Sequence, residues 1–84
     1  MKYATDRPFA GPEAAARKLL DIVRASIAES RLPHAYTGAT NTAFMRAGGS
    51  VDEYSVGMKH AAEQKWIEVD RSGTRIVLLP DGAE

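Results

Sequence analysis

Apolar residues in the first third of the 84-residue chain recur at intervals of three and four, the period of an amphipathic helix. Pro12 suits the first helical position, and the helix should end near Ser30, ahead of Leu32-Pro33, because the residue before a proline avoids the helical region. The inward stripe comprises Ala16, Leu19, Leu20, Val23 and Ile27. The pattern predicts a first helix over residues 12–30.

A second, shorter helix is predicted from residue 39 or 40 through Ala47. Thr37 or Thr40 can cap its start, and the pair Gly48-Gly49 ends it. Its inward residues are Ala43, Phe44 and Ala47.

A third helix begins at a capping box directly after the two glycines. The Ser50 hydroxyl can accept from the backbone N–H of Glu53, while the Glu53 carboxylate accepts from the N–H of Ser50. The helix ends at Lys65, and its inward stripe comprises Tyr54, Met58, Ala61 and Ala62. Gly57 lies on this stripe and favours close approach by another helix over a functional kink. A helix, a tight turn and a second capped helix are the layout of a helix-turn-helix, whose second helix is the candidate recognition helix.

The hydrophobic period changes to two after Lys65, which predicts a β-hairpin with a two-residue turn at Ser72-Gly73. Gly73 takes the positive φ. The predicted register pairs Ile67 with Leu78, Val69 with Ile76, and Asp70 with Arg75. This register leaves three apolar residues on the outer face of the hairpin, Trp66, Val77 and Leu79.

Three remaining segments are shorter. Residues 1–11 form an arm, in which Tyr3 and Phe9 suit a strap across the hairpin or the first helix, while a frayed terminus fits the same residues. Residues 33–37 are expected as a minimal third strand anchored by Tyr36, with His34 as a solvated loop residue. The tail after Pro80 is expected to be exposed. The predicted fold class is therefore α+β, a single domain over residues 12–84 with three helices, a C-terminal hairpin and a short third strand.

Composition excludes several classes of function. Eleven basic and eleven acidic residues cancel, so the chain lacks the net positive field of a dedicated nucleic-acid or membrane-surface binder. The absence of cysteine fits a reducing compartment, and with no secretory or membrane-spanning run the cytoplasm is expected. No metal, cofactor, small-molecule ligand or membrane is inferred. An enzyme is disfavoured, because the sequence has no nucleophile elbow, no His-x-x-x-His pair and no dinucleotide loop.

Three stretches in the second half of the chain form a recognisable pattern: the run from Ala61 to Glu68, then Arg71-Ser72-Gly73, and then Leu79-Pro80-Asp81-Gly82. With this pattern the chain resembles the winged-helix superfamily of small bacterial DNA-binding domains. In that superfamily a recognition helix ends in a glycine followed by Leu-Ile or Trp-Ile, a hairpin wing follows, and a Leu-Thr-x-x-Gly-like exit opens a final helix. Lys65 stands here where that glycine usually stands.

The resemblance leaves two functions open. A DNA-binding module, such as a small transcriptional regulator, uses Ser55, Lys59 and His60 toward bases, with Arg46 and Arg71 on phosphates. A protein-interaction module, or a homodimer, uses the exposed side of the third helix or the face formed by Trp66, Val77 and Leu79. The charge near the candidate recognition helix sums to about zero, which weighs against strong DNA binding.

Overall fold

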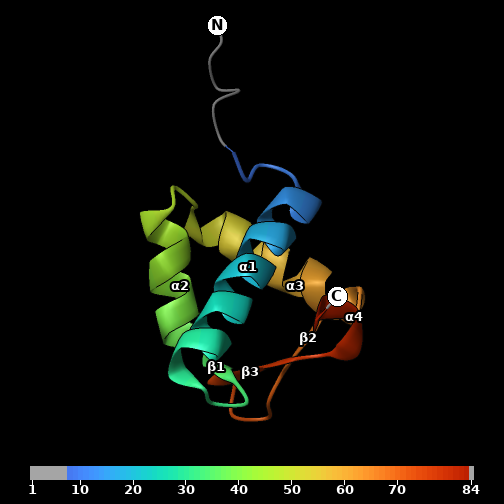
Figure 1. Cartoon of the computed structure of the whole chain (residues 1–84). Coiled ribbons are helices and arrows are strands. Elements are labelled where there is room, and N and C mark those ends of the chain that lie inside the picture. The colour runs from blue at the N-terminus through green and yellow to red at the C-terminus, as the bar shows by residue number, and fades with distance from the viewer. Residues whose placement is uncertain (1–7, 84) are drawn as a thin grey trace, which may run out of the picture.

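The chain folds into an α+β domain, seen in the computed structural model of Figure 1, which describes residues 8–83. The elements in order are α1 (Pro12–Ser30), β1 (Ala35–Tyr36), α2 (Thr37–Arg46), α3 (Val51–Glu63), β2 (Ile67–Val69), β3 (Arg75–Leu78) and α4 (Pro80–Ala83). The three longer helices lie together and the small sheet closes one end of them (Figure 1). The prediction of α+β with a third strand is confirmed, and α1 has the predicted bounds.

The core forms around α1, which contacts both other long helices. On one side the buried residues Ala15, Leu19 and Phe44 pack together, and Phe9 stacks on Phe44 with ring centroids 5.2 Å apart. On the other side α1 packs against the sheet residues Ala35, Ile67 and Ile76. Phe9 of the arm therefore contacts the α1–α2 cluster rather than the hairpin, and Tyr3 lies outside the described residues.

The capping box at the start of α3 is confirmed. The N–H of Ser50 donates to Glu53 Oε1 over 3.0 Å, and the N–H of Glu53 donates to Ser50 Oγ over 3.1 Å. The close approach predicted at Gly57 is also present, because a Cβ placed there would lie 2.8 Å from Ala15 Cβ on α1. One member of the predicted stripe is wrong: Ala61 is buried, but Ala62 faces solvent.

The C-terminal end of α3 closes on a left-handed residue that is not glycine. Lys65 adopts a left-handed backbone conformation, with φ of +63°. The N–H of Lys65 donates to the carbonyl of Ala62, and the N–H of Trp66 donates to that of Ala61, each over 3.0 Å. These two bonds are those of a Schellman motif, which satisfies the last carbonyls of the helix.

The sheet is antiparallel with the order β1-β3-β2. The predicted pairs Ile67 with Leu78 and Val69 with Ile76 are confirmed. The predicted third strand is β1, but its inward residue is Ala35, opposite Ile76. Tyr36, expected to anchor this strand, is 45% exposed. The expectation for Tyr36 is wrong because the pleat turns only alternate residues of a strand toward the core.

The hairpin turn is longer than the predicted two residues, since β2 ends at Val69 and β3 begins at Arg75. The Asp70 carboxylate accepts from the Ser72 hydroxyl at 2.8 Å and from the N–H groups of Thr74 and Arg75 at 3.2 Å. The hydrogen bond from Ser72 lowers the pKa of Asp70 most, and the backbone donors add to it. Asp70 also pairs with Arg75 as predicted, at 3.5 Å. Gly73 has the predicted positive φ, +78°.

Helix α2 begins at Thr37, two or three residues before its predicted start, and no side chain caps it. The hairpin takes that role instead. The N–H of Thr37 donates to the carbonyl of Thr74, and the Thr37 hydroxyl donates to that of Gly73, both over 2.9 Å. The alternative cap, Thr40, is 1% exposed inside the helix. Phe44 is buried as expected, Ala43 is half-buried, and Ala47 faces solvent.

The C-terminal segment is not the exposed tail that the sequence suggested. Gly82 in α4 is buried, and its carbonyl accepts from Nε of Arg24 on α1 over 2.9 Å. A Cβ at Gly82 would lie 2.1 Å from the backbone oxygen of Trp66, so only glycine fits this contact. The segment docks where the partly buried Arg24 side chain donates to the Gly82 carbonyl and where Gly82 lies against the backbone of Trp66.

Trp66 does not share an outer face with Val77 and Leu79, contrary to prediction. Its side chain packs against the α1–sheet core, and the guanidinium carbon of Arg17 lies 5.4 Å from its ring centroid. His34 is also not a solvated loop residue. It is half-buried, with its ring edge-on to Tyr36 at a centroid distance of 5.0 Å.

Candidate nucleic-acid interface

An open groove runs between the start of α2, the outer side of α3 and the hairpin. It is lined by Thr37, Gly38, Asn41, Tyr54, Ser55, Met58, Val69 and Gly73. The lining residues come from four separate elements of the chain, so the groove exists only in the folded molecule.

Three hydrogen bonds hold the walls of the groove together. The two bonds from Thr37 to the carbonyls of Gly73 and Thr74 fix the hairpin turn against the start of α2. The Tyr54 hydroxyl donates to the carbonyl of Thr37 over 3.2 Å and joins α3 to the same point. Burial raises the pKa of Tyr54, so its hydroxyl stays protonated and remains a donor at neutral pH. The groove is therefore a shaped surface rather than a gap between loose elements.

The groove offers polar groups of the kind that read base edges. Asn41 and Ser55 are both exposed and present an amide and a hydroxyl from neighbouring helices. Lys59 lies one helical turn beyond Ser55 on the exposed side of α3, and Arg71 is exposed in the hairpin turn. Side-chain amides and hydroxyls bind base edges in the major groove, whereas cations bind phosphates.

Of the five residues suggested by the sequence, Ser55 lines the groove. Lys59 is exposed one turn farther along α3, and Arg71 is exposed in the hairpin turn, two residues before the lining residue Gly73. Arg46 is the last residue of α2, and the hairpin turn contacts the first, so Arg46 lies about 15 Å away along the helix. His60 is half-buried and its ring faces Trp66, with centroids 6.0 Å apart. This contact places His60 on the flank of α3 away from Ser55.

Sequence reasoning missed Thr37 and Asn41 as part of this surface. The sequence pattern indicated Thr37 only as a possible helix cap and did not single out Asn41. Their spacing of four puts them on one face of α2. That spacing was the available signal, but it could not show that the hairpin lies beside this face.

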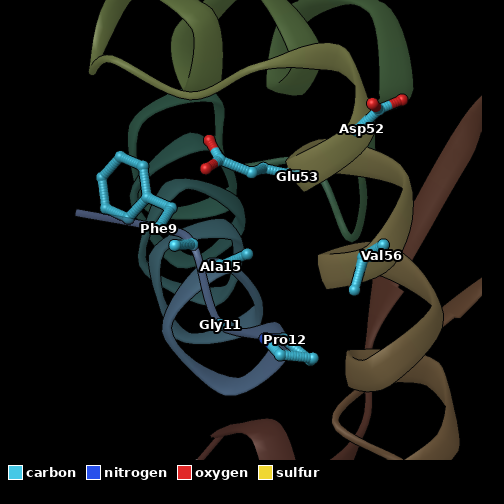
Figure 2. Close-up of a pocket in the computed structure, with 8 residues that line it drawn as sticks. Phe9, Gly11, Pro12, Ala15, Asp52, Glu53 and Val56 are labelled. Carbon is cyan, nitrogen blue, oxygen red and sulfur yellow. The ribbon is translucent and has the colours of Figure 1, made fainter. Parts of the chain in front are cut away.

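A second, smaller cleft lies between the start of α1 and the first turns of α3 (Figure 2). Its volume of about 170 Å³ is below the 300–1,000 Å³ of typical small-molecule sites. The lining is mainly apolar, from Phe9, Ala10, Gly11, Pro12, Ala15 and Val56, with Asp52 and Glu53 at one side. In Figure 2 the Glu53 side chain extends from α3 toward Phe9, and Val56 lies on the opposite wall. The cleft has room for a single apolar side chain.

The predicted partner face is divided in the structure. Val77 is 39% exposed and Leu79 is half-buried, whereas Trp66 turns toward α1. More apolar surface is exposed on α3 itself, where Val51 is 70% and Val56 47% exposed.

Other kinds of site find little support. Among residues 8–83 no group of three or more histidines and carboxylates could hold a metal ion. Over the same residues, no helix is both long and apolar enough to cross a membrane. No family model, no curated protein and no solved structure matches the chain.

Proposed function

We propose that the chain is a DNA-binding module of the winged-helix type, of the size of a small transcriptional regulator. Helix α3 enters the major groove and the β2–β3 turn, as the wing, contacts the adjacent backbone. Ser55 and Asn41 contact base edges, and Lys59 and Arg71 contact phosphates. The observation that carries the proposal is the groove that joins α2, α3 and the hairpin around exposed polar side chains.

Local features of the chain support the same proposal. In the superfamily that this chain resembles, a glycine stands at the position of Lys65. Lys65 has the left-handed backbone conformation that glycine favours there, so the change from glycine to lysine leaves the conformation unchanged. A helix also begins at Pro80, where the resemblance implies a final helix. We place the protein in the cytoplasm as part of this proposal, because the cysteine-free chain suits a reducing compartment.

The expected affinity of one monomer for duplex DNA is low. The chain has no net charge, and Asp52 lies in the first turn of α3, the helix that carries Ser55 and Lys59. Phosphate contacts supply most of the non-specific affinity, and a single module of this kind has only a few of them.

The proposal is tested by charge reversal at Lys59. Labelled mixed-sequence duplex is titrated at low salt with the wild type and with Lys59→Glu, and binding is followed by fluorescence anisotropy. Because Lys59 is placed on a phosphate, we expect the reversal to lower affinity by about tenfold or more for every duplex. Ser55→Ala should change the preference among sequences with a smaller loss, because the hydroxyl contacts bases.

Lys65→Glu is the matched control. It makes the same change in total charge, but Lys65 lies beyond the C-terminal end of α3, farther from Ser55 along the chain than Lys59. We expect this variant to keep most of the affinity. Absence of binding at millimolar wild-type protein, or equal losses in both variants, contradicts the proposed surface.

A protein-interaction module is the second candidate. It is favoured by the apolar cleft beside Phe9 together with the exposed Val51 and Val56. These valines and the cleft lie at the start of α3. If the wild type fails to bind duplex, this apolar surface becomes the leading candidate for partner binding.

A further inference from the structure

Helix α1 carries a second stripe beside its core-facing stripe, and one of its members, Ile22, also packs at the edge of the cluster of Ala15, Leu19 and Phe44. Lys18, Ile22, Ala25 and Glu29 follow one another at intervals of four, three and four, the spacing of a coiled-coil seam. Ala25 and Glu29 are exposed, and Lys18 and Ile22 are half-buried. The stripe combines an apolar centre with a cation at one end and an anion at the other.

The C-terminal half of this stripe borders a groove between α1 and α2. The groove has a volume of about 320 Å³ and is lined by Ile22, Ala25, Ser26, Glu29, Ala39, Thr40 and Ala43. Small residues on both helices keep the groove wide enough for another backbone to approach closely. Thr40 is 1% exposed, and its hydroxyl oxygen has no hydrogen-bond partner within residues 8–83.

We propose that this groove binds helix α1 of a second copy of the chain, in a symmetric antiparallel dimer. A two-fold axis between residues 23 and 24 places Ile22 of each copy opposite Ala25 of the other. The same axis places Lys18 opposite Glu29, twice in the dimer. One register thus satisfies the apolar and the charged pairs together, which a self-complementary two-fold interface requires.

The charges argue for a second copy rather than an unrelated partner. Among residues 8–83, Lys18 and Glu29 form no ion pair, whereas Arg17 pairs with Glu13 at 2.8 Å and Arg24 lies 4.0 Å from Asp21. The segment that enters the groove brings Lys18 of the second copy to Glu29, the one acidic residue that lines the groove. The interface is therefore complementary in charge to itself.

The dimer is expected to be weak. Stable interfaces bury about 1,200–2,000 Å² in total, and a single pair of helices of this length supplies less. We therefore expect a dissociation constant on the order of 0.1 mM. The proposal does not rest on DNA binding, because the stripe lies on α1 and none of its residues lines the α3 groove.

The test is a charge swap followed by sedimentation equilibrium of the full chain at low salt, from micromolar to millimolar protein. Lys18→Glu alone and Glu29→Lys alone should each weaken the dimer about tenfold, because each change turns both symmetry-related attractions into repulsions. The double variant Lys18→Glu with Glu29→Lys should restore the wild-type dissociation constant, since the pairs are re-formed with their signs exchanged.

Two further variants complete the design. Ala25→Glu places a carboxylate at the apolar centre and should leave a folded monomer, because Ala25 is exposed in the single chain. Glu68→Lys is the matched control, since it makes the same charge change as Glu29→Lys at an exposed residue of β2. A wild type that stays monomeric at millimolar concentration overturns the proposal. A dimer that the single reversals leave unchanged, or that the double variant does not restore, overturns it as well.

Discussion

Lys65 occupies a backbone conformation that glycine adopts without steric cost. The left-handed region costs a non-glycine residue about 1–2 kcal/mol, because its Cβ approaches the following carbonyl oxygen. The Schellman bonds at the end of α3 hold Lys65 in this conformation, with φ of +63°. The strain is therefore fixed by the helix end and does not depend on what the lysine side chain contacts.

We expect Lys65→Gly to stabilise the protein by about 0.5–1 kcal/mol. The relief of strain is offset in part by the greater freedom of glycine in the unfolded chain. Lys65→Ala is the control, because it removes the same side chain but keeps the Cβ, and it should not stabilise. Urea denaturation of the three proteins measures the difference. A glycine variant no more stable than the alanine variant would show that position 65 is unstrained.

At the scale of single residues, local interactions were predicted from the sequence and long-range burial was not. The capping box of Ser50 and Glu53 spans three residues and was predicted in full. The positions of Tyr36 and Trp66 were wrong, because the pairing of β1 with β3 and the packing of Trp66 against α1 involve segments distant in sequence. The expectation for His34 was wrong for a local reason, since its ring lies against Tyr36, two residues away. Ser55, Lys59 and Arg71 came from the helical and strand periods, and their role in binding stays a prediction.

At the scale of helices, Gly57 and Gly38 can be compared, because both lie in helices but different atoms surround them. Gly57 lies where α3 crosses α1, and an added Cβ would meet Ala15 Cβ at 2.8 Å and Leu19 Cδ1 at 2.9 Å. Gly38 lies in the first turn of α2, with nothing within 4 Å of the same position. Alanine has the higher helix propensity, by about 1 kcal/mol in a helix interior.

Gly57→Ala should therefore destabilise the protein, and Gly38→Ala should leave it unchanged or more stable. Overpacking of a close contact costs about 1–3 kcal/mol, which exceeds the gain in helix propensity. Ser50→Ala gives a scale for comparison, since loss of a helix cap costs about 1 kcal/mol. Chemical denaturation of the three variants measures these changes. If Gly57→Ala is as stable as Gly38→Ala, the α1–α3 contact is not as close as described.

The sequence missed α4 and misplaced the start of α2. Each is held by a hydrogen bond to a residue distant in the sequence. The first turn of α2 is fixed by the Gly73 carbonyl, 36 residues away from Thr37. Helix α4 is held by the bond from Arg24, 58 residues before Gly82. These separations are far longer than the period of a helix or a strand, so hydrophobic periodicity could not predict either hydrogen bond. The bounds of α1 and the start of α3 follow from periodicity and local caps, so the sequence alone predicted them.

At the scale of the whole molecule, the charges balance, with eleven basic and eleven acidic residues. No general electrostatic attraction to DNA is therefore expected at long range, and affinity must come from local contacts. This balance distinguishes the chain from modules that bind DNA through a net positive surface. It also makes the number of phosphate contacts measurable, because few cations contribute.

The salt dependence of DNA binding should be shallow. Each phosphate neutralised on duplex DNA contributes about −0.9 to the slope of log affinity against log salt concentration. With Lys59 and Arg71 as the contributing cations, we expect a slope of about −2 per monomer, which a further contact from Arg46 would steepen to about −3. Arg46 lies at the other end of α2 from the hairpin turn, so its substitution tests how many cations contact phosphates. If it reaches a phosphate, Arg46→Ala should reduce the slope by about one and weaken every duplex equally.

The measurement is a series of anisotropy titrations from low to physiological salt, at protein concentrations where sedimentation finds a monomer. The concentration matters, because a dimer that engages both halves of a site roughly doubles the number of contacts and the slope. A slope near zero with binding retained would remove the phosphate contacts from the proposal and leave only apolar or base contacts. An unchanged slope in Arg46→Ala would confine the interface to Lys59 and Arg71, the cations nearest the groove between α3 and the wing.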